Sequence, residues 1–331
     1  MSTVAPWIAS QAQQLLAQRG HAWLLQGPSG LGQYCLALAL ARAWLCEGPT
    51  AQGACGDCPS CHAIDVRTHA DLCVLMPETA MLELGWPLDE KAQADIDDKK
   101  RKPSKEIRIE AMRNAIEFSQ RTSARGHGKV VLVFPAERMN HVTANALLKT
   151  LEEPPGDVRF ALASEAAHLL LPTIRSRCLG HAMAWPEPDV ALSWLAQQGM
   201  ATRDASLWLR AAGGRPEDAI RLAGDGLQPS SWGGLPLAVA RGELDVFKDW
   251  SPLQVIDALQ KLCHDLLARQ FGAAPRYFEL SEMPPAGSLW ALTAWAGELA
   301  QSRRTAEHPF NVGLMVETLV SRAQIAINSA R

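Results

Sequence analysis

Four cysteines gathered in one short stretch restrict the local fold of this chain more than any other feature of its sequence. Cys46, Cys55, Cys58 and Cys61 lie within sixteen positions, while the other four cysteines are spread over the rest of the 331 residues. Two CxxC steps that share Cys58 let a tight turn place three sulfurs around one ion, and Cys46 closes a tetrahedron. The stretch is therefore predicted to fold around a structural zinc ion with no open coordination position.

Other interpretations of the cysteine cluster stay open from the sequence. An iron–sulfur cluster is the chemical alternative, and buried or redox-active thiols are another. His62 is also able to replace one of the four thiolates. Disulfides are disfavoured, because clustered CxxC spacings in a reducing compartment are typical of metal ligands.

The composition is that of an ordinary globular protein. Apolar residues make up 47% and charged residues 20% of the chain, which excludes a largely disordered protein. A net charge of −3 disfavours a strongly basic nucleic-acid binder, although a local patch or a complex can still hold DNA. The apolar run 36–45 is too short for a bilayer span and no secretion signal is found, so a cytoplasmic protein without membrane contact is expected.

A glycine-rich loop joins the first predicted strand, 22–26, to a helix predicted over 34–46. The segment Gly27-Pro28-Ser29-Gly30-Leu31-Gly32-Gln33-Tyr34 has the glycines of a phosphate-binding loop. In a working loop a lysine contacts the phosphates and a Ser or Thr hydroxyl holds Mg²⁺, but these two positions are Gln33 and Tyr34 here. We interpret the segment as a degenerate loop that keeps its turn and has lost its nucleotide chemistry.

The buried strand predicted over 129–134 shows a similar loss at its end. A nucleotide hydrolase places an Asp there to coordinate Mg²⁺ and an acid beside it to orient the attacking water. This chain has Phe134 and Pro135 instead, and the nearest acid, Glu137, comes too late in the sequence. Two separate sites have lost their catalytic groups, so no ATP hydrolysis is expected.

Strand and helix patterns alternate in the first half of the chain, whereas the second half has only helical patterns. Further strands are predicted over 71–76, 159–163 and 179–183, and a further helix over 143–153. This alternation favours a parallel sheet covered on both faces. The charged segment 89–105 is interpreted as a solvated loop before a helix that starts near Ile107. In the second half, helices are predicted over 190–198, 202–212, 216–223, 235–241, 251–269, 289–303 and 311–327.

Three segments make the sequence similar to a known family. They are His21-Ala22 before the first strand, the run NALLKTLEEPP at 145–155, and the triplet Ser176-Arg177-Cys178. Together they resemble the bacterial clamp-loader subunits of DNA polymerase III, which belong to the AAA+ class of ATPases. The degenerate loop and the four cysteines make the chain most similar to the member of that family that does not hydrolyse ATP.

The resemblance implies a domain organisation and a set of partners. It implies an α/β AAA+-type domain over 1–180 with the zinc module at 46–61, a small helical lid domain over 181–226, and an all-α collar domain over 227–331. It also implies a hetero-pentamer with gamma/tau and delta subunits. That complex opens the sliding clamp and places it on primed DNA during replication.

The resemblance further implies roles for single residues. Arg177 is the candidate arginine finger that reaches a neighbour's bound ATP across a subunit interface. The simple alternative for Arg177 is a surface arginine in an ion pair. The sensor arginine of the lid domain is expected near Glu217, where this chain has an acid. Ser164 falls at the end of the sensor strand, but its role is in doubt because no nucleotide is expected.

Two other functions are weighed against a non-hydrolysing subunit. A self-sufficient ATPase of the gamma/tau type is disfavoured by Gln33, Tyr34 and Phe134, and nucleotide binding by the isolated chain separates the two. A stand-alone zinc module that binds DNA by sequence is disfavoured by the pI of about 6.3 and by the lack of a basic recognition helix. Salt-dependent DNA binding by the isolated protein would favour that third function.

Overall fold

The structure, a computed structural model, describes residues 4–225, 227–306, 308 and 311–329. The chain divides between Pro186 and Glu187 into two units, and each is described by itself. The predicted collar domain and all of the predicted lid domain except 181–186 fall in the second unit, and residue 226 at their predicted boundary lies outside the described residues. The division into three domains therefore stays a prediction.

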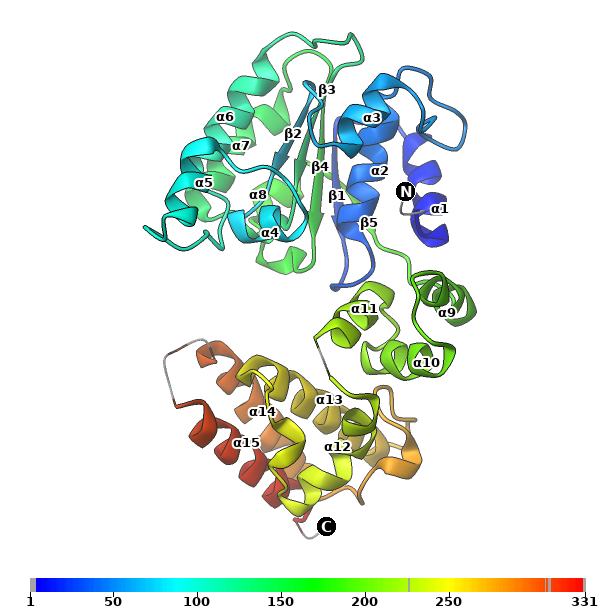
Figure 1. Ribbon diagram of the computed structural model, residues 1–331, viewed down its shortest axis with the longest axis vertical. Helices are drawn as coiled ribbons and strands as arrows, with labels where there is room; N and C mark the ends of the chain where they lie inside the picture. Colours follow the sequence, from blue (N-terminus) through cyan, green and yellow to red (C-terminus); the bar gives the residue numbers. More distant parts are fainter. Residues whose placement is uncertain (1–3, 226, 307, 309–310, 330–331) are drawn as a thin grey trace. The chain divides into compact units, whose positions relative to one another are not determined.

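A parallel sheet forms the centre of the first unit (Figure 1). Its five strands in the described residues have the order β2-β3-β4-β1-β5. They are β1 (Ala22–Gln26), β2 (Leu72–Leu75), β3 (Lys129–Val133), β4 (Val158–Ser164) and β5 (Leu179–Ala182). All neighbouring strands pair in parallel, and the central ones are apolar because both of their faces are buried. The predicted α/β architecture with a parallel sheet is confirmed, and each predicted strand is found to within one residue at either end.

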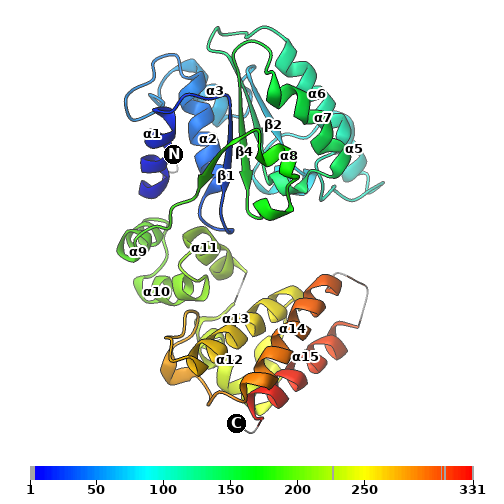
Figure 2. The same cartoon turned by 180° about the vertical axis from the view of Figure 1, so that it is seen from behind.

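Helices cover both faces of this sheet (Figures 1 and 2). On one face lie α2 (Gln33–Leu45) and α3 (Pro59–Asp65), and α1 (Pro6–Leu16) packs on α2. The other face is covered by α6 (Ile109–Gln120) and α7 (His141–Glu152). The alternation of side chains along β3 explains this arrangement, because Val130 packs with Leu45 and Ile64, whereas Val131 packs on the opposite face. The shorter elements are α4 (Glu78–Glu83), α5 (Glu90–Asp97), α8 (Pro172–Arg175) and the 3₁₀ turns Ala136–Arg138 and Ala167–Leu169.

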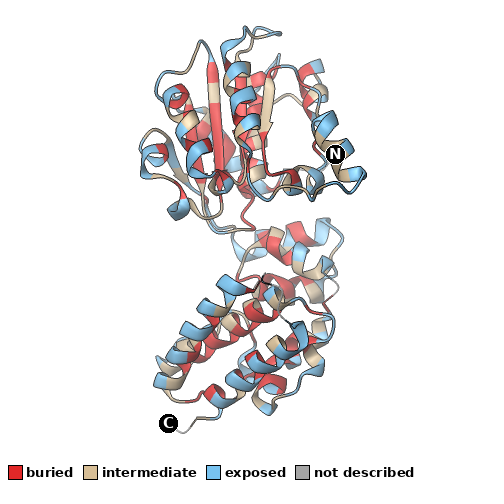
Figure 3. Ribbon diagram, turned by 90° about the vertical axis from the view of Figure 1, so that its left-hand side faces the viewer, coloured by how far each residue is buried: buried red, intermediate tan, exposed pale blue. Residues whose placement is uncertain are grey.

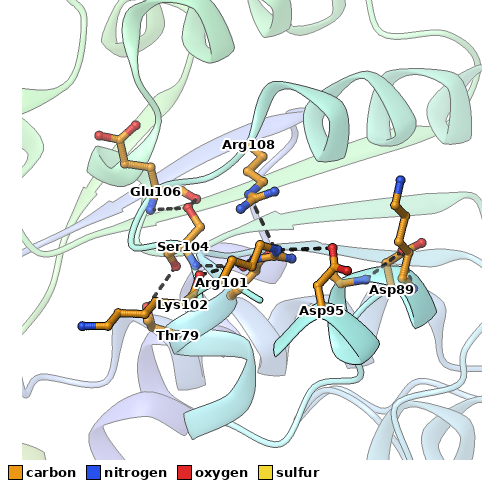
Figure 4. Close-up of polar contacts among 11 residues, drawn as sticks. Thr79, Asp89, Asp95, Arg101, Lys102, Ser104, Glu106 and Arg108 are labelled. Atoms are coloured by element: carbon orange, nitrogen blue, oxygen red, sulfur yellow. Dashed lines mark hydrogen bonds and ion pairs between the residues drawn. The ribbon is translucent and has the colours of Figure 1, made fainter. Parts of the chain in front are cut away.

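The charged segment 89–105 is more ordered than predicted, so its interpretation as a solvated loop was wrong in part. It contains α5, which begins where the Asp89 carboxylate accepts hydrogen bonds from the first turn of the helix. After α5, Arg101 lies 3.7 Å from Asp95 (Figure 4). Arg101 also donates to Glu78 at 2.9 Å. The backbone N–H of Ser104 donates to the same Glu78 carboxylate at 2.8 Å. The sequence did not indicate that segment 89–105 is ordered, because Glu78 lies more than 20 positions before its partners Arg101 and Ser104.

Only helices and turns form the second unit in its described residues. The helices are α9 (Pro188–Gln197), α10 (Thr202–Ala211), α11 (Pro216–Gly224), α12 (Pro229–Arg241), α13 (Pro252–Gln270), α14 (Leu289–Thr305) and α15 (Val312–Ile327), with 3₁₀ turns at Asp245–Phe247 and Leu280–Glu282. The start of α12 was predicted too late, because burial of Trp232 outweighs the poor helix propensity of Gly233 and Gly234. None of the described helices is both long and apolar enough to cross a membrane.

Tryptophans build much of the core of the second unit, where buried residues follow the inward faces of the helices (Figure 3). The Trp232 ring stacks on Phe278 with 5.0 Å between centroids, and Trp208 and Trp250 lie 6.3 and 6.4 Å from it. The Lys261 ammonium lies 5.2 Å from the centre of the Trp232 ring. Packing therefore explains part of the content of eleven tryptophans in this sequence.

Candidate functional site

The four clustered cysteines come together in space. Cys46 caps the end of α2, Cys58 caps the start of α3, Cys61 lies in the first turn of α3, and Cys55 lies in the loop between the two helices. Their sulfurs all lie within 4.8 Å of one another, and Cys46 Sγ is 3.4, 3.8 and 3.8 Å from the other three. Sulfurs bound tetrahedrally to zinc at about 2.3 Å stand about 3.8 Å apart. The separations therefore suit one ion shared by four thiolates.

The pKa values of these thiols differ within the cluster. Burial raises the pKa of Cys58, but hydrogen bonds from the backbone of Glu47 and Cys61 and from neighbouring thiols outweigh it and bring the pKa to about 6. Burial raises the pKa of Cys61 to about 12 and also raises that of Cys46. Four adjacent thiolates need a positive ion between them. None of the eight cysteines, all within the described residues, forms a disulfide.

Polar contacts join the cysteine module, residues 46–61, to the residues around the starts of β2 and β3. Glu47, next to Cys46, accepts hydrogen bonds from Ser60 and from Arg125, each at 2.8 Å. The backbone N–H of Arg125 donates to Asp71, a fully buried carboxylate that also pairs with Lys129 at 3.1 Å. These contacts fix the module against the segment between α6 and β3.

The glycine loop, residues 27–34, is held by hydrogen bonds within the loop. It connects β1 to α2, and Gly30 and Gly32 have φ of 77° and 91°, a conformation that glycine adopts without strain. The Gln33 side chain is 2% exposed, and its amide donates to the backbone oxygens of Gly27 and Pro28 at 2.8 and 2.7 Å. The side chain at the lysine position is thus engaged by the loop's own carbonyl groups.

Two aromatic side chains that the sequence places at predicted metal-binding positions contact each other. The ring of Tyr34, at the hydroxyl position of the loop, lies 5.4 Å from the ring of Phe134, which follows β3. Trp86 Nε1 donates to the Tyr34 hydroxyl at 2.7 Å, and the Arg67 guanidinium stacks on the Trp86 ring at 4.5 Å. The two positions where the sequence lacks the expected catalytic groups therefore pack against each other.

The remaining nucleotide-site positions are also occupied by contacts within the chain. Ser164, at the end of β4, donates to Glu137 at 2.7 Å, and the backbone N–H of Glu165 donates to the same carboxylate at 3.1 Å. Glu217 lies in the first turn of α11, and the nearby Arg215 pairs with Asp218 at 2.9 Å. Glu217, the acid at the position where the resemblance implies a sensor arginine, thus lies at the start of a helix.

Arg177 lies just after α8 and contacts its own chain. Its Nη2 forms an ion pair with Glu152 at the end of α7, and its Nη1 donates to the Thr173 backbone oxygen at 3.0 Å. The side chain is 28% exposed, and its Nε is buried without a hydrogen-bond partner in the described structure. The ion pair named as the simple alternative is therefore present, and part of the side chain remains accessible.

Sequence reasoning missed two residues at these sites. Trp86 follows α4 in a segment with no recognisable motif, so no signal pointed to its contact with Tyr34. Glu152 belongs to the run 145–155 that carries the family resemblance, but nothing in the sequence indicated that it faces Arg177.

Comparison with known proteins gives one family and several related proteins. The family described as DNA polymerase III, delta subunit, matches residues 7–184. The delta′ subunit of DNA polymerase III from Pseudomonas aeruginosa is 39% identical over 232 residues, which cover 69% of this chain and 64% of the relative. The delta′ subunit from Escherichia coli is 34% identical over 223 residues, 66% of this chain and 60% of the relative. The tau subunit from Salmonella typhimurium is 29% identical over 245 residues, 72% of this chain and 34% of the relative. The match thus spans less than two thirds of the length of each of these relatives.

Proposed function

The chain belongs to the delta-prime family of DNA polymerase III subunits, and we propose that it is a clamp-loader subunit that does not itself hydrolyse ATP. The observation that carries this proposal is the contact between Tyr34 and Phe134. Rings at the two metal-binding positions leave no ligand for Mg²⁺ there, and the Gln33 amide is bound to the loop that would hold the phosphates.

We further propose that the chain supplies Arg177 to an ATP site on a neighbouring gamma/tau subunit. The partly exposed guanidinium of Arg177 supports this role, because a planar cation with several N–H donors suits a phosphate. Its partners would be gamma/tau and delta subunits in a hetero-pentamer. The whole complex would open the sliding clamp and place it on primed DNA.

The helices of the second unit supply the proposed lid, 181–226, and the proposed collar, 227–331. Three of the most exposed large apolar side chains of the chain lie on α14 and α15: Trp290 is 82%, Ile325 69% and Leu314 63% exposed. Exposed apolar side chains such as these are available for burial against another protein. This supports subunit contacts through the collar.

The cysteine module is proposed to hold a structural zinc ion. Cys46, Cys55, Cys58 and Cys61 would bind it, and the ion would fix a loop-rich segment that has few apolar residues of its own. Four ligands leave no place for substrate, so no reaction is assigned to the ion. Reduced thiols and a replication role suit the cytoplasm.

The isolated chain is expected neither to bind nor to hydrolyse ATP. Without a phosphate-binding lysine and metal ligands, we expect a dissociation constant weaker than about 1 mM, which corresponds to less than about 4 kcal/mol of binding free energy. Isothermal titration with Mg-ATP and a phosphate-release assay on the purified chain measure both quantities. Gln33→Lys should not restore hydrolysis, because Phe134 still takes the place of the metal ligand. Turnover by the wild-type chain would instead favour an active ATPase of the gamma/tau type.

Assembly provides the direct test of the proposed function. The chain is mixed with the gamma/tau and delta subunits of the same organism and analysed by gel filtration. One complex that contains all three subunits is the expected result. A chain that elutes alone and binds DNA by itself would support the stand-alone zinc module instead.

A further inference from the structure

Glu152 occupies an unfavourable position unless a cation accompanies it. It is the last residue of α7, where the unpaired backbone carbonyl groups already give the helix end a partial negative charge. The Arg177 side chain lies against this end and pairs with the Glu152 carboxylate. The helix end and the carboxylate therefore both attract the same guanidinium.

Two contacts fix the plane of that guanidinium. Glu152 holds Nη2, and the backbone oxygen of Thr173, in α8, holds Nη1 at 3.0 Å. An arginine guanidinium has two N–H groups on each terminal nitrogen. One N–H on Nη1 and one on Nη2 thus stay available for an acceptor outside the chain, while Nε is buried.

We propose that Glu152 is a positioning residue for Arg177. Together with Thr173 it holds the guanidinium so that its two remaining N–H groups meet the terminal phosphate of ATP bound to a neighbouring subunit. The inference rests on the arginine-finger role proposed above, and it adds the residue that orients the finger. A side chain oriented in advance loses less rotamer freedom when it binds the phosphate.

The Glu152 contact is too weak to keep Arg177 away from a phosphate. Glu152 is 53% exposed, and a pair between partly exposed charges contributes little to stability. A phosphate carries more negative charge than one carboxylate and does not need to displace Glu152. The geometry therefore supports a role for Glu152 in orienting the Arg177 guanidinium and not in holding it back from a phosphate.

The test measures the DNA-stimulated ATPase rate of the assembled clamp loader. The difference between the wild-type rate and the Arg177→Ala rate is the contribution of Arg177. Glu152→Ala is expected to lower this contribution about two- to fivefold, the size set by a partly exposed charge pair. Glu152→Gln keeps an acceptor oxygen and should lose less. The double variant Glu152→Ala/Arg177→Ala should be no slower than Arg177→Ala alone, because a positioning residue has no effect once its target is absent. Glu153→Ala is the matched control, since it removes the same charge from the next position.

The outcomes separate this inference from the proposed function. An Arg177→Ala loader with the wild-type ATPase rate would overturn the arginine-finger role and the inference that rests on it. If Arg177→Ala is slow, a wild-type or faster rate with Glu152→Ala overturns the inference alone. The same follows if Glu153→Ala matches Glu152→Ala, or if the double variant is slower than Arg177→Ala.

Discussion

Cys58→Ser is expected to abolish zinc binding and to lower the free energy of unfolding of the first unit. A metal that binds only the folded state stabilises it by about 4 kcal/mol when its free concentration is about a thousand times its dissociation constant. Serine still caps α3 well, so the cap that Cys58 provides is kept and the loss isolates the metal. Plasma emission spectrometry gives the metal content, and urea unfolding gives the free energy.

Cys35→Ser is the matched control for this experiment. Cys35 is an exposed cysteine outside the four-cysteine cluster, so its replacement should leave one zinc per chain and the unfolding curve unchanged. A wild-type chain that contains no zinc and is as stable as the Cys58→Ser variant would contradict the proposal. Iron in place of zinc would favour the iron–sulfur alternative.

Arg177→Ala is expected to leave the chain folded and able to assemble while it impairs one ATP site of the loader. An arginine finger contributes about 10³-fold or more to hydrolysis at the site it completes. The other sites keep their own fingers, so the total DNA-stimulated ATPase rate and clamp loading should fall only in part. Stability should change by less than about 1 kcal/mol, because the ion pair with Glu152 is partly exposed.

Arg175→Ala is the control for the Arg177 variant. Arg175 is an exposed arginine two positions earlier, in α8, and lies outside the triplet 176–178. Gel filtration with the partner subunits reports assembly, and ATPase assays on primed DNA report hydrolysis. Equal rates for the two variants, or an Arg177→Ala chain that does not fold, would disprove the role assigned to Arg177.

The fold of the first unit was accessible from the sequence because its strands are short, apolar and bounded by clear turns. The segments 22–26 and 129–133 are buried on both faces, so apolar runs alone identify them. Segment 89–105 was harder, since its order depends on Glu78, a partner that charge patterns along the chain do not reveal. The start of α12 was missed because burial of Trp232 overrides local propensity.

In the candidate sites, too, features set by neighbouring residues were evident from the sequence, whereas contacts between distant segments were not. The cysteine spacing pointed to a single ion, and the structure brings the four sulfurs together. The losses at Gln33, Tyr34 and Phe134 were also evident from their residue types. That Tyr34 and Phe134 touch, and that Glu152 holds Arg177, depends on packing between segments far apart in the chain, which no single-sequence pattern encodes.

The contact between Tyr34 and Phe134 also bears on how such a subunit can evolve. A change of Tyr34 back to a small hydroxyl residue would leave the Trp86 N–H without its acceptor and the Phe134 ring without its neighbour. A change of Phe134 to aspartate would set a carboxylate against an aromatic ring before any metal could bind. Each reversal alone is therefore expected to cost stability before any activity could return. If the chain does not hydrolyse ATP, as proposed, the contact between Tyr34 and Phe134 would make its reliance on neighbouring subunits hard to reverse by single substitutions.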